Sequence, residues 1–453
     1  MQEGIAGTRR ITGRKTAFRW IVLIMIFIVY MIAGADRANI GVVIPYIKVE
    51  FGLTNTDIGA MASLFYLAYA LIQIPSGYLY EKYGVRKLFG LAMILTSAAT
   101  YFIGLSTSAL GVKVGRVLLG LAEGPIPIAM LTTINRWFPP SEKGTATGVY
   151  MSSIKFAPAV VPPLCALIIS TLGWRDVFVI FAIPGFFITV AWWWLVSDRP
   201  ENSRFVSQEE LDYIQSAKSR QVAQSRSEGK KKACLKWIDK IIRTRTPDLL
   251  DTNAKVLKSW DIWACSFGYF LMVGIVYAIM TWVPTYLVTV KHYAIIKMGF
   301  VAAAPWVGAI LGSLIGGYLS DNFFEKRRKP LMLLTALATS GMMYALIYTP
   351  NDAVLLSLML LVAGVLLNLG YSAFLVYPMG ITTKEKCPLA TSVVNFWGSL
   401  GGAFTPFIVG VILDKYDWDF VFTFLSVSSF LTFLLLFTMI EPIEGYTESK
   451  TQG

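Results

Sequence analysis

Charged residues are scarce in this 453-residue chain, because only 15% of its residues are Asp, Glu, Lys or Arg. Soluble domains usually carry about 25%. Histidine occurs once, and the four cysteines have no metal-ligand spacing. These shortages exclude an ordinary soluble enzyme, a disordered chain and a coiled coil. They also argue against a disulfide framework and against a metal site, so we expect no metal and no cofactor.

Apolar residues are abundant, at 55% of the chain with a mean hydropathy of +0.59. A helix needs about 20 mostly apolar residues to cross a membrane. The runs are continuous rather than alternating, which excludes a transmembrane β-barrel. The sequence therefore predicts an all-α membrane protein with twelve transmembrane helices, at about 18–46, 55–79, 86–107, 110–135, 144–171, 174–196, 259–290, 297–319, 330–349, 352–381, 388–413 and 418–440.

The chain divides into two halves that repeat. Three short matches recur in order at offsets of 240, 244 and 244 residues: 77–81 with 317–321, 146–147 with 390–391, and 174–178 with 418–422. Related halves in a membrane indicate alternating access to a central site. The predicted parts are an N-terminal segment (1–17), a six-helix bundle (18–196), a basic linker (197–258), a second six-helix bundle (259–440) and a tail (441–453).

The net charge of +12 is unusual for a protein made for lipid. With the N-terminus in the cytoplasm, 31 of the 40 Lys and Arg residues fall on cytoplasmic segments. This bias satisfies the positive-inside rule. We therefore expect a multi-pass protein of the cell membrane with both termini and the linker in the cytoplasm. The charge is explained by topology and gives no reason to expect nucleic acid as a partner.

Five charged residues lie deep within predicted spans rather than near their ends: Asp36, Arg37, Arg116, Glu123 and Lys155. A charge inside the bilayer costs at least about 2.5–3.5 kcal/mol, so each must face a cavity or a partner. Arg116 and Glu123 lie two turns apart on one face of a helix, about 10 Å along its axis. Long side chains or a shared water are needed to connect them.

The second half has no comparable charge. Its spans offer neutral polar and aromatic side chains instead, among them Trp282, Asn368, Ser372 and Asn395. We expect the first half to attract the anion and carry protons, and the second half to supply hydrogen bonds and aromatic walls.

The chemistry of such a site follows from its charges. Burial in a low-dielectric cavity favours the protonated form of a carboxyl group, whereas a nearby arginine favours the carboxylate. An arriving anion competes for the arginine and so raises the affinity of the acid for a proton. This is a physical route to the joint movement of an anion and protons.

Structural alternatives exist for each candidate. An Arg116–Glu123 pair can have a purely structural role, Asp36 can cap a helix, and Lys155 can extend towards a carbonyl group or an acid. Asn and Ser inside membrane helices often serve only packing. His292, the single histidine, is predicted to be a solvated loop residue.

A repeated loop follows the second span of each half. The first copy contains Gly77, Glu81 and Arg86, and the second contains Gly317 and Asp321. We expect the glycines to let helices approach closely. The acid and the basic residues after it are expected to form a latch between helices at the cytoplasmic side.

This loop resembles the signature Gly-x-x-x-Asp-Arg-x-Gly-Arg-Arg of the major facilitator superfamily, with Glu81 and Lys82 in place of Asp and Arg. Residues 36–41, Asp-Arg-Ala-Asn-Ile-Gly, look like the first-helix motif of its anion:cation symporter family, which includes sialin-like and bacterial sugar-acid transporters. Residues 116–127, 137–139 and 395–402 are similar to other motifs of that family.

The resemblance implies roles for individual residues. Asp36 and Glu123 would be the protonatable pair, and Arg37 and Arg116 would bind the substrate carboxylate. The cavity would be lined by further side chains, among them Tyr69, Gln73 and Asn395. Lys155 departs from the sugar-acid branch, where a neutral residue is expected. A further cation there suits a dianion or a sulfonate, or takes over part of the role of Arg116.

These observations favour a secondary transporter that imports a small organic anion, such as a sugar acid, carboxylate or sulfonate, together with protons. An antiporter or exporter remains an alternative, since the fifth span has prolines but lacks the preceding glycine pattern of such proteins. A sensor whose linker binds a partner or anionic lipid is another. A membrane enzyme is disfavoured, because no nucleophile–base pair or nucleotide-binding loop is present. By resemblance, we expect a monomer.

Overall fold

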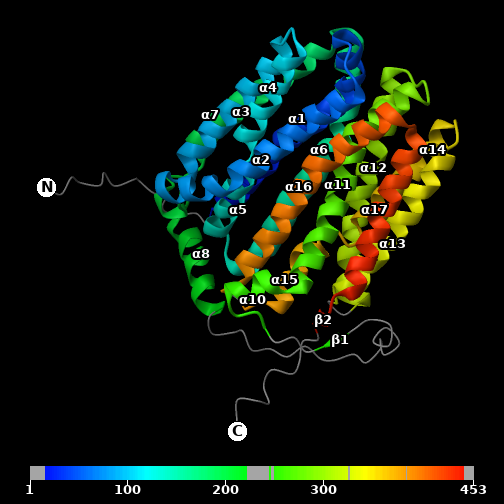
Figure 1. Cartoon of the computed structure of the whole chain (residues 1–453). Helices are drawn as coiled ribbons and strands as arrows, with labels where there is room; N and C mark the ends of the chain where they lie inside the picture. The colour runs from blue at the N-terminus through cyan, green and yellow to red at the C-terminus, as the bar shows by residue number, and fades with distance from the viewer. Residues whose placement is uncertain (1–15, 222–243, 246–248, 325–326, 384, 443–453) are drawn as a thin grey trace. The chain divides into compact units, whose positions relative to one another are not determined.

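Helices make up nearly all of this computed structural model, which describes residues 16–221, 244–245, 249–324, 327–383 and 385–442 (Figure 1). Eleven helical stretches of these residues are long and apolar enough to cross a membrane. The remaining predicted span coincides with α2. The spanning helices of the first half are α1 (Phe18–Phe51), α2 (Asn55–Tyr83), α3 (Val85–Leu105), α4 (Ala109–Glu123), α5 (Ile126–Trp137), α6 (Pro140–Thr171) and α7 (Trp174–Leu195).

The second half repeats this order. Its spanning helices are α11 (Trp260–Thr289), α12 (Ile295–Tyr318), α13 (Lys329–Ala345), α14 (Ala353–Asn368), α15 (Ala373–Ile381), α16 (Cys387–Lys415) and α17 (Trp418–Thr438). A five-residue π-helical turn (Leu319–Phe323) extends α12. The expected all-α membrane fold is therefore confirmed.

The fourth and tenth predicted spans are each broken into two helices. The first break follows Glu123, where Gly124 and Pro125 separate α4 from α5. A proline has no N–H to donate, so it starts a helix more readily than it continues one. The second break follows Asn368 and separates α14 from α15. Discontinuous helices at matching places in two repeats point to the binding site of a transporter.

The linker between the halves contains regular structure that its polar composition does not predict. Helix α8 (Gln208–Gln221) and the short α10 (Asn253–Lys258) lie within it. A two-residue strand, β1 (Thr244–Arg245), pairs in parallel with β2 (Glu441–Pro442) after the last helix. The linker is thus attached to the segment that follows α17.

Two compact units make up the molecule. Unit 1 comprises Met1–Asn39, Ala68–Ala157 and Leu172–Lys230, and unit 2 comprises Ile40–Leu67, Pro158–Thr171 and Lys231–Gly453. Their boundary passes through the middle of α1, α2 and α6. The division into two six-helix bundles at the linker stays a prediction that rests on the sequence repeat.

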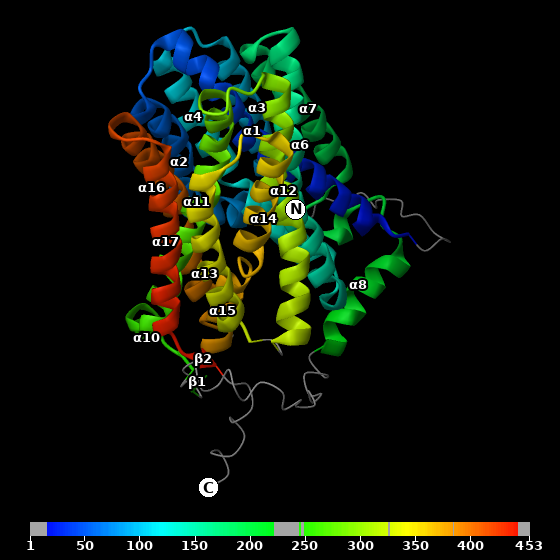
Figure 2. The ribbon, with the colours of Figure 1, turned by 90° about the vertical axis from the view of Figure 1, so that its right-hand side faces the viewer.

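The repeat is visible in the packing within each unit. In unit 1, α3 packs along α7, and in unit 2 the equivalent α13 packs along α17 (Figures 1 and 2). Each pair carries the same cap: Asp198 Oδ1 accepts from the Arg86 backbone N–H at 2.9 Å, and Glu441 Oε2 accepts from the Lys329 backbone N–H at 2.9 Å. In unit 1 the acid follows α7 and caps the start of α3, and in unit 2 the acid follows α17 and caps the start of α13.

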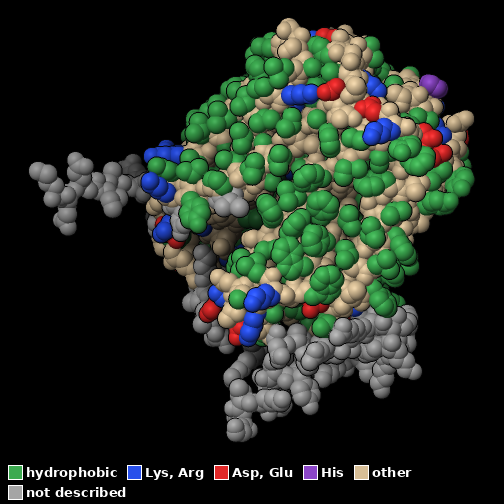
Figure 3. Space-filling view, in the orientation of Figure 1, with side chains coloured by type: hydrophobic (Ala, Val, Ile, Leu, Met, Phe, Trp, Pro, Cys, Tyr) green, Lys and Arg blue, Asp and Glu red, His purple; other side chains and the backbone are tan. Residues whose placement is uncertain are grey.

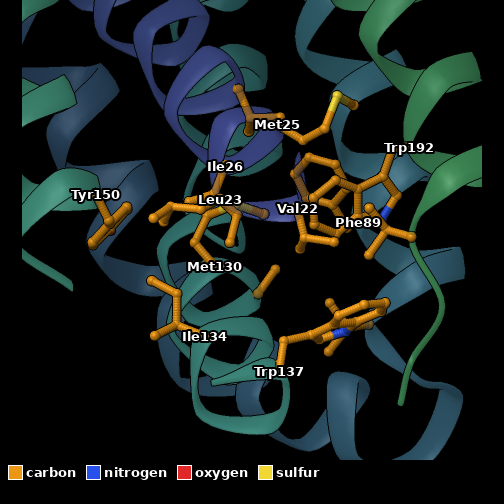
Figure 4. Packing of buried hydrophobic residues seen from close by; sticks show 14 of the residues in the cluster. Val22, Leu23, Met25, Ile26, Phe89, Met130, Ile134, Trp137, Tyr150 and Trp192 are labelled. Carbon is orange, nitrogen blue, oxygen red and sulfur yellow. The ribbon is translucent and has the colours of Figure 1, made fainter. Parts of the chain in front are cut away.

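A large apolar cluster forms the core of unit 1. It joins Val22 and Ile26 of α1 to Met130 of α5, and Phe89 of α3 packs on Trp192 of α7 with ring centroids 4.2 Å apart (Figure 4). In a membrane, such helices associate through close packing rather than through escape from water.

Apolar side chains also cover most of the face drawn in Figure 3. Leu71, Phe187 and Leu314 are 62%, 73% and 68% exposed. Exposed apolar surface of this extent is what a lipid environment requires of membrane-spanning helices.

Candidate functional site

Four of the five intramembrane charges come together in unit 1. Asp36 and Arg37 lie on α1, and Arg116 and Glu123 lie on α4; all four are at most 6% exposed. Arg37 Nε donates to Glu123 Oε2 at 2.9 Å, and this ion pair joins the two helices. A buried ion pair is costly to assemble and costly to break, because either partner alone is an uncompensated charge.

The partner of Glu123 differs from the one that the sequence suggests. Helical spacing places Arg116 on the same face of α4, whereas the observed ion pair runs to Arg37 on α1. Arg116 Nη1 instead donates to the backbone carbonyl of Asp36 at 3.2 Å. Both arginines therefore tie α4 to the same turn of α1. Arg37 thus binds a carboxylate, and Arg116 binds a peptide carbonyl oxygen.

Aromatic side chains surround the Arg37 guanidinium. Its carbon lies 5.3 Å from the ring centroid of Tyr30 and 4.8 Å from that of Tyr69. Arg37 Nη1 also donates to the Tyr30 hydroxyl at 3.4 Å. Tyr150 of α6 packs edge-on to Tyr30, with ring centroids 4.7 Å apart. Cation–π contacts of this kind attract the guanidinium to the ring faces and help to fix its position. The predicted role of Tyr69 at the site is thus compatible with its position.

Asn39 is a further buried polar residue of this cluster, and in the sequence it stands out only as part of the motif at residues 36–41. It is 0% exposed, one turn after Asp36, and its Nδ2 lies 3.5 Å from Asp36 Oδ1. In the sequence, Asn39 can be recognised as a candidate because its amide lies one helical turn from the Asp36 carboxylate within a membrane span.

Gly124 explains how the break after Glu123 fits against α2. A Cβ at this position would lie 2.2 Å from Ile72 Cγ2 and 2.7 Å from the Tyr69 carbonyl oxygen. Only glycine allows this approach, which brings the end of α4 against the turn of α2 that carries Tyr69. Gln73, one turn further along α2, is half-buried. The glycine beside Glu123 and Pro125 is the sequence signal for this contact.

Lys155 lies on a turn of α6 that runs beside the same part of α1. A Cβ at Gly34 of α1 would lie 2.7 Å from the Cβ of Ala157. The Lys155 side chain is half-buried. The first four residues carry no net formal charge, and Lys155 adds one positive charge to the same unit. The predicted role of Lys155 in binding an anion stays a prediction.

The predicted residues of the second half lie in unit 2. Trp282 is 2% exposed, and its Nε1 donates to the Pro406 carbonyl oxygen at 3.0 Å. Asn368 is 6% exposed, and its Nδ2 donates to the Gly364 carbonyl oxygen at 3.0 Å. Ser372, before α15, and Asn395 of α16 are exposed. The substrate-binding role of these four residues stays a prediction.

The Major Facilitator Superfamily profile matches residues 26–402 and 296–453 of the sequence. The chain belongs to the major facilitator superfamily. As a member of this superfamily it is a transport protein that crosses the membrane many times, and it is not an enzyme.

Curated relatives of this superfamily member match over nearly its full length. It is 26% identical over 97% of its residues to a probable galactarate/D-glucarate transporter of Bacillus subtilis, 96% of which is covered. A D-galactonate transporter of Escherichia coli is 28% identical, with 91% of this chain and 93% of the relative covered. A probable sulfoacetate transporter of Cupriavidus necator is 26% identical, with coverages of 89% and 90%.

The solved structures agree on the fold. The crystal structure of a bacterial homologue of the human lysosomal transporter Spinster is similar with a TM-score of 0.68. It covers 93% of this chain, which covers 95% of it, at 17% sequence identity. The predicted two-half fold of the major facilitator superfamily is therefore confirmed.

The superfamily loop after the second helix of each half contains Gly77 and Gly317. A Cβ at Gly77 or at Gly317 would meet no described atom within 4 Å. Close approaches occur at other glycines, among them Gly34 and Gly124. The expected close helix approach at Gly77 and Gly317 stays a prediction.

The other predicted gating residues are only partly described. Arg86 Nε donates to the Trp193 carbonyl oxygen of α7 at 3.1 Å, so Arg86 links α3 to α7 within unit 1. The side chains of Glu81 and Asp321 lie outside the described residues. Their predicted part in a latch stays a prediction.

Proposed function

We propose that this member of the major facilitator superfamily is a secondary transporter that moves a small organic anion across the cell membrane together with protons. The observation that carries the proposal is the buried Arg37–Glu123 ion pair, with Arg116 and Asp36 beside it. Its relatives are named as galactarate/D-glucarate, D-galactonate and sulfoacetate transporters, all of which have anionic substrates. A sugar acid or a sulfonate is therefore the substrate class to test first.

Coupling follows from competition for Arg37. In the described structure the guanidinium is held by the Glu123 carboxylate. A substrate carboxylate that binds the guanidinium takes the place of Glu123, because charge-assisted hydrogen bonds to arginine are strong and directional. Glu123 then lies buried without its counter-charge and gains a proton. Release of the anion returns Arg37 to Glu123 and expels the proton.

Import of an anion together with protons would use both the arginines and the acids of the site. Two alternative functions differ from it in what they require. An antiporter would exchange one organic anion for another and need no proton gradient. A transport-fold sensor would bind its ligand without moving it. Both would use the same arginines, so only flux measurements separate them.

Uptake into proteoliposomes tests the proposal. The purified protein is reconstituted, an inward proton gradient is imposed, and accumulation of galactarate, galactonate and sulfoacetate is measured with and without a protonophore. We expect accumulation of at least one of these anions that collapses when the protonophore is added. Accumulation that ignores the gradient but needs an anion inside the vesicle would indicate an antiporter. Binding without flux of any anion would indicate a sensor.

A further inference from the structure

An acid near the end of α16 caps the start of α2 in unit 2. Asp414 Oδ1 accepts from the Asn55 backbone N–H at 2.8 Å, and Oδ2 accepts from the Thr56 backbone N–H at 2.7 Å and from its hydroxyl at 2.6 Å. The first N–H groups of a helix lack partners within it, and the helix dipole favours a negative charge there. Asp414 therefore satisfies two donors and the dipole at once.

The same pair of helices is in direct backbone contact. A Cβ at Gly59 of α2 would lie 2.6 Å from the Pro406 carbonyl oxygen and 2.9 Å from the Phe407 Cα. A Cβ at Gly410 of α16 would lie 2.4 Å from the Asn55 carbonyl oxygen. Glycines from both sides thus allow α2 and α16 to lie against each other.

Helix α1 has an equivalent contact with α11. A Cβ at Gly41 would lie 2.3 Å from the Met280 carbonyl oxygen. Next to it, the Tyr66 hydroxyl donates to Met280 Sδ at 3.6 Å, and the Tyr66 and Tyr277 rings lie 4.1 Å apart. Helix α6 packs closely against α12 in the same way. A Cβ at Gly299 of α12 would lie 2.8 Å from the Pro162 carbonyl oxygen of α6.

These contacts lie within one compact unit, yet they join helices of different sequence repeats. Helices α1, α2 and α6 belong to the first repeat, and α11, α12 and α16 belong to the second. A transporter that exposes its site alternately to the two sides must separate its repeats on one side at a time. The contacts of this region must then break when this end of the molecule opens.

We propose that Asp414 is the latch of a gate formed by the ends of α1, α2, α6, α11, α12 and α16, and that it holds this gate closed. This inference deepens the proposed transport function and rests on it. Asp414 is exposed, so its hydrogen bonds can exchange with water. When the gate opens, the Asn55 and Thr56 N–H groups are hydrated instead. The capping residue Thr54 stays with α2, since its hydroxyl binds the Asp57 backbone N–H at 3.1 Å within the same helix end.

Accessibility of a cysteine at Met280, which is buried at the contact between α1 and α11, tests this inference without any substrate. Met280→Cys is introduced after Cys165, Cys234, Cys265 and Cys387 have been replaced by serine, and its rate of reaction with a charged maleimide is measured on the purified protein. Asp414→Asn is expected to raise this rate by up to about fivefold, because the amide keeps one acceptor oxygen but lacks the negative charge that the start of α2 favours. Asp414→Glu is expected to restore a slow rate.

Two further variants make the outcome decisive. Asp417 caps α17 within its own chain segment, through the Asp419 and Phe420 backbone N–H groups, so Asp417→Asn should leave the rate unchanged. Gly59→Ala should raise the rate by pushing α2 away from α16, whether or not Asp414 is present. Equal rates for the parent, Asp414→Asn and Gly59→Ala would overturn the gate.

The two proposals fail separately. If labelling depends on Asp414 but no organic anion is transported, the gate is supported and the proposed transport function is contradicted. Proton-driven uptake with labelling that ignores Asp414 would remove the latch alone.

Discussion

Glu123 is bound to Arg37 by a single short ion pair, and this contact makes its protonation testable. Glu123→Gln keeps an oxygen that accepts from Arg37 Nε but cannot carry a proton. We expect gradient-driven accumulation to fall by about tenfold or more, because the anion can no longer be coupled to a proton. Exchange of labelled for unlabelled anion across proteoliposomes should persist. Glu209→Gln, at an exposed position, is the control, and unchanged accumulation in Glu123→Gln would exclude Glu123 from coupling.

Lys155 is predicted to bind the substrate, and as an additional cation it is expected to select for doubly charged substrates. Lys155→Ala should weaken binding of galactarate, a dianion, by about tenfold, the scale of one hydrogen bond to a charged group. Binding of galactonate, a monoanion, should change much less. Calorimetric titration of both ligands measures the ratio, with Lys297→Ala at an exposed position as the control. Equal losses for the two anions would show that Lys155 does not recognise the second charge.

The residue types of the site were predictable, and their pairing was not. Charges within apolar spans are few, so Asp36, Arg37, Arg116 and Glu123 stand out in the sequence. The Arg37–Glu123 bond joins residues 86 positions apart. It depends on the rotation of α1 against α4, which no local pattern encodes. The Gly124 contact with α2 has the same origin.

At the scale of elements, continuous apolar runs predicted the spanning helices to within a few residues. The same criterion treats the segment after Glu123 as one helix, since Gly and Pro are common in membrane helices. It therefore missed both helix breaks. The linker elements were missed for a different reason: α8 is mostly polar, and its attachment comes from a few long-range contacts rather than from a pattern.

A buried acid of α8 makes several hydrogen bonds to the start of α1. Glu210 is 1% exposed and accepts from the Thr16 hydroxyl at 2.6 Å, the Phe18 N–H at 3.0 Å, and the Arg19 N–H and Nη1 at 3.1 and 3.0 Å. Arg19 in turn binds Glu142 of α6 at 2.7 Å. A carboxylate at a helix start satisfies free N–H groups and the dipole together.

Glu210→Gln should therefore release α8. An amide presents one acceptor oxygen where the carboxylate presents two, so hydrogen bonds to buried donors are lost at a cost of about 1–3 kcal/mol. We expect a lower apparent Tm and faster cleavage of the linker by added trypsin. Glu209→Gln, the exposed neighbour, is the matched control. Cleavage at the parent rate in Glu210→Gln would mean that other contacts hold α8.

At the scale of the whole molecule, the distribution of charge predicts how the protein is inserted. Most Lys and Arg residues lie on one set of segments, which includes the N-terminus and the linker. The positive-inside rule places these segments in the cytoplasm. The turn between α3 and α4, which contains exposed Thr107, should then face outwards, and exposed Asn202 of the linker should face inwards.

Single cysteines at these two positions, in a background whose four native cysteines are replaced by serine, decide the orientation. In intact bacterial cells, a membrane-impermeant maleimide should label Thr107→Cys and leave Asn202→Cys unlabelled. Permeabilised cells should give labelling of both, which shows that each cysteine is reactive. The reverse pattern in intact cells would show that the protein is inserted in the inverted orientation, with its termini and linker outside. Labelling of both in intact cells would place both positions outside. The chain would then cross the membrane an even number of times between them, against the odd number that the sequence predicts.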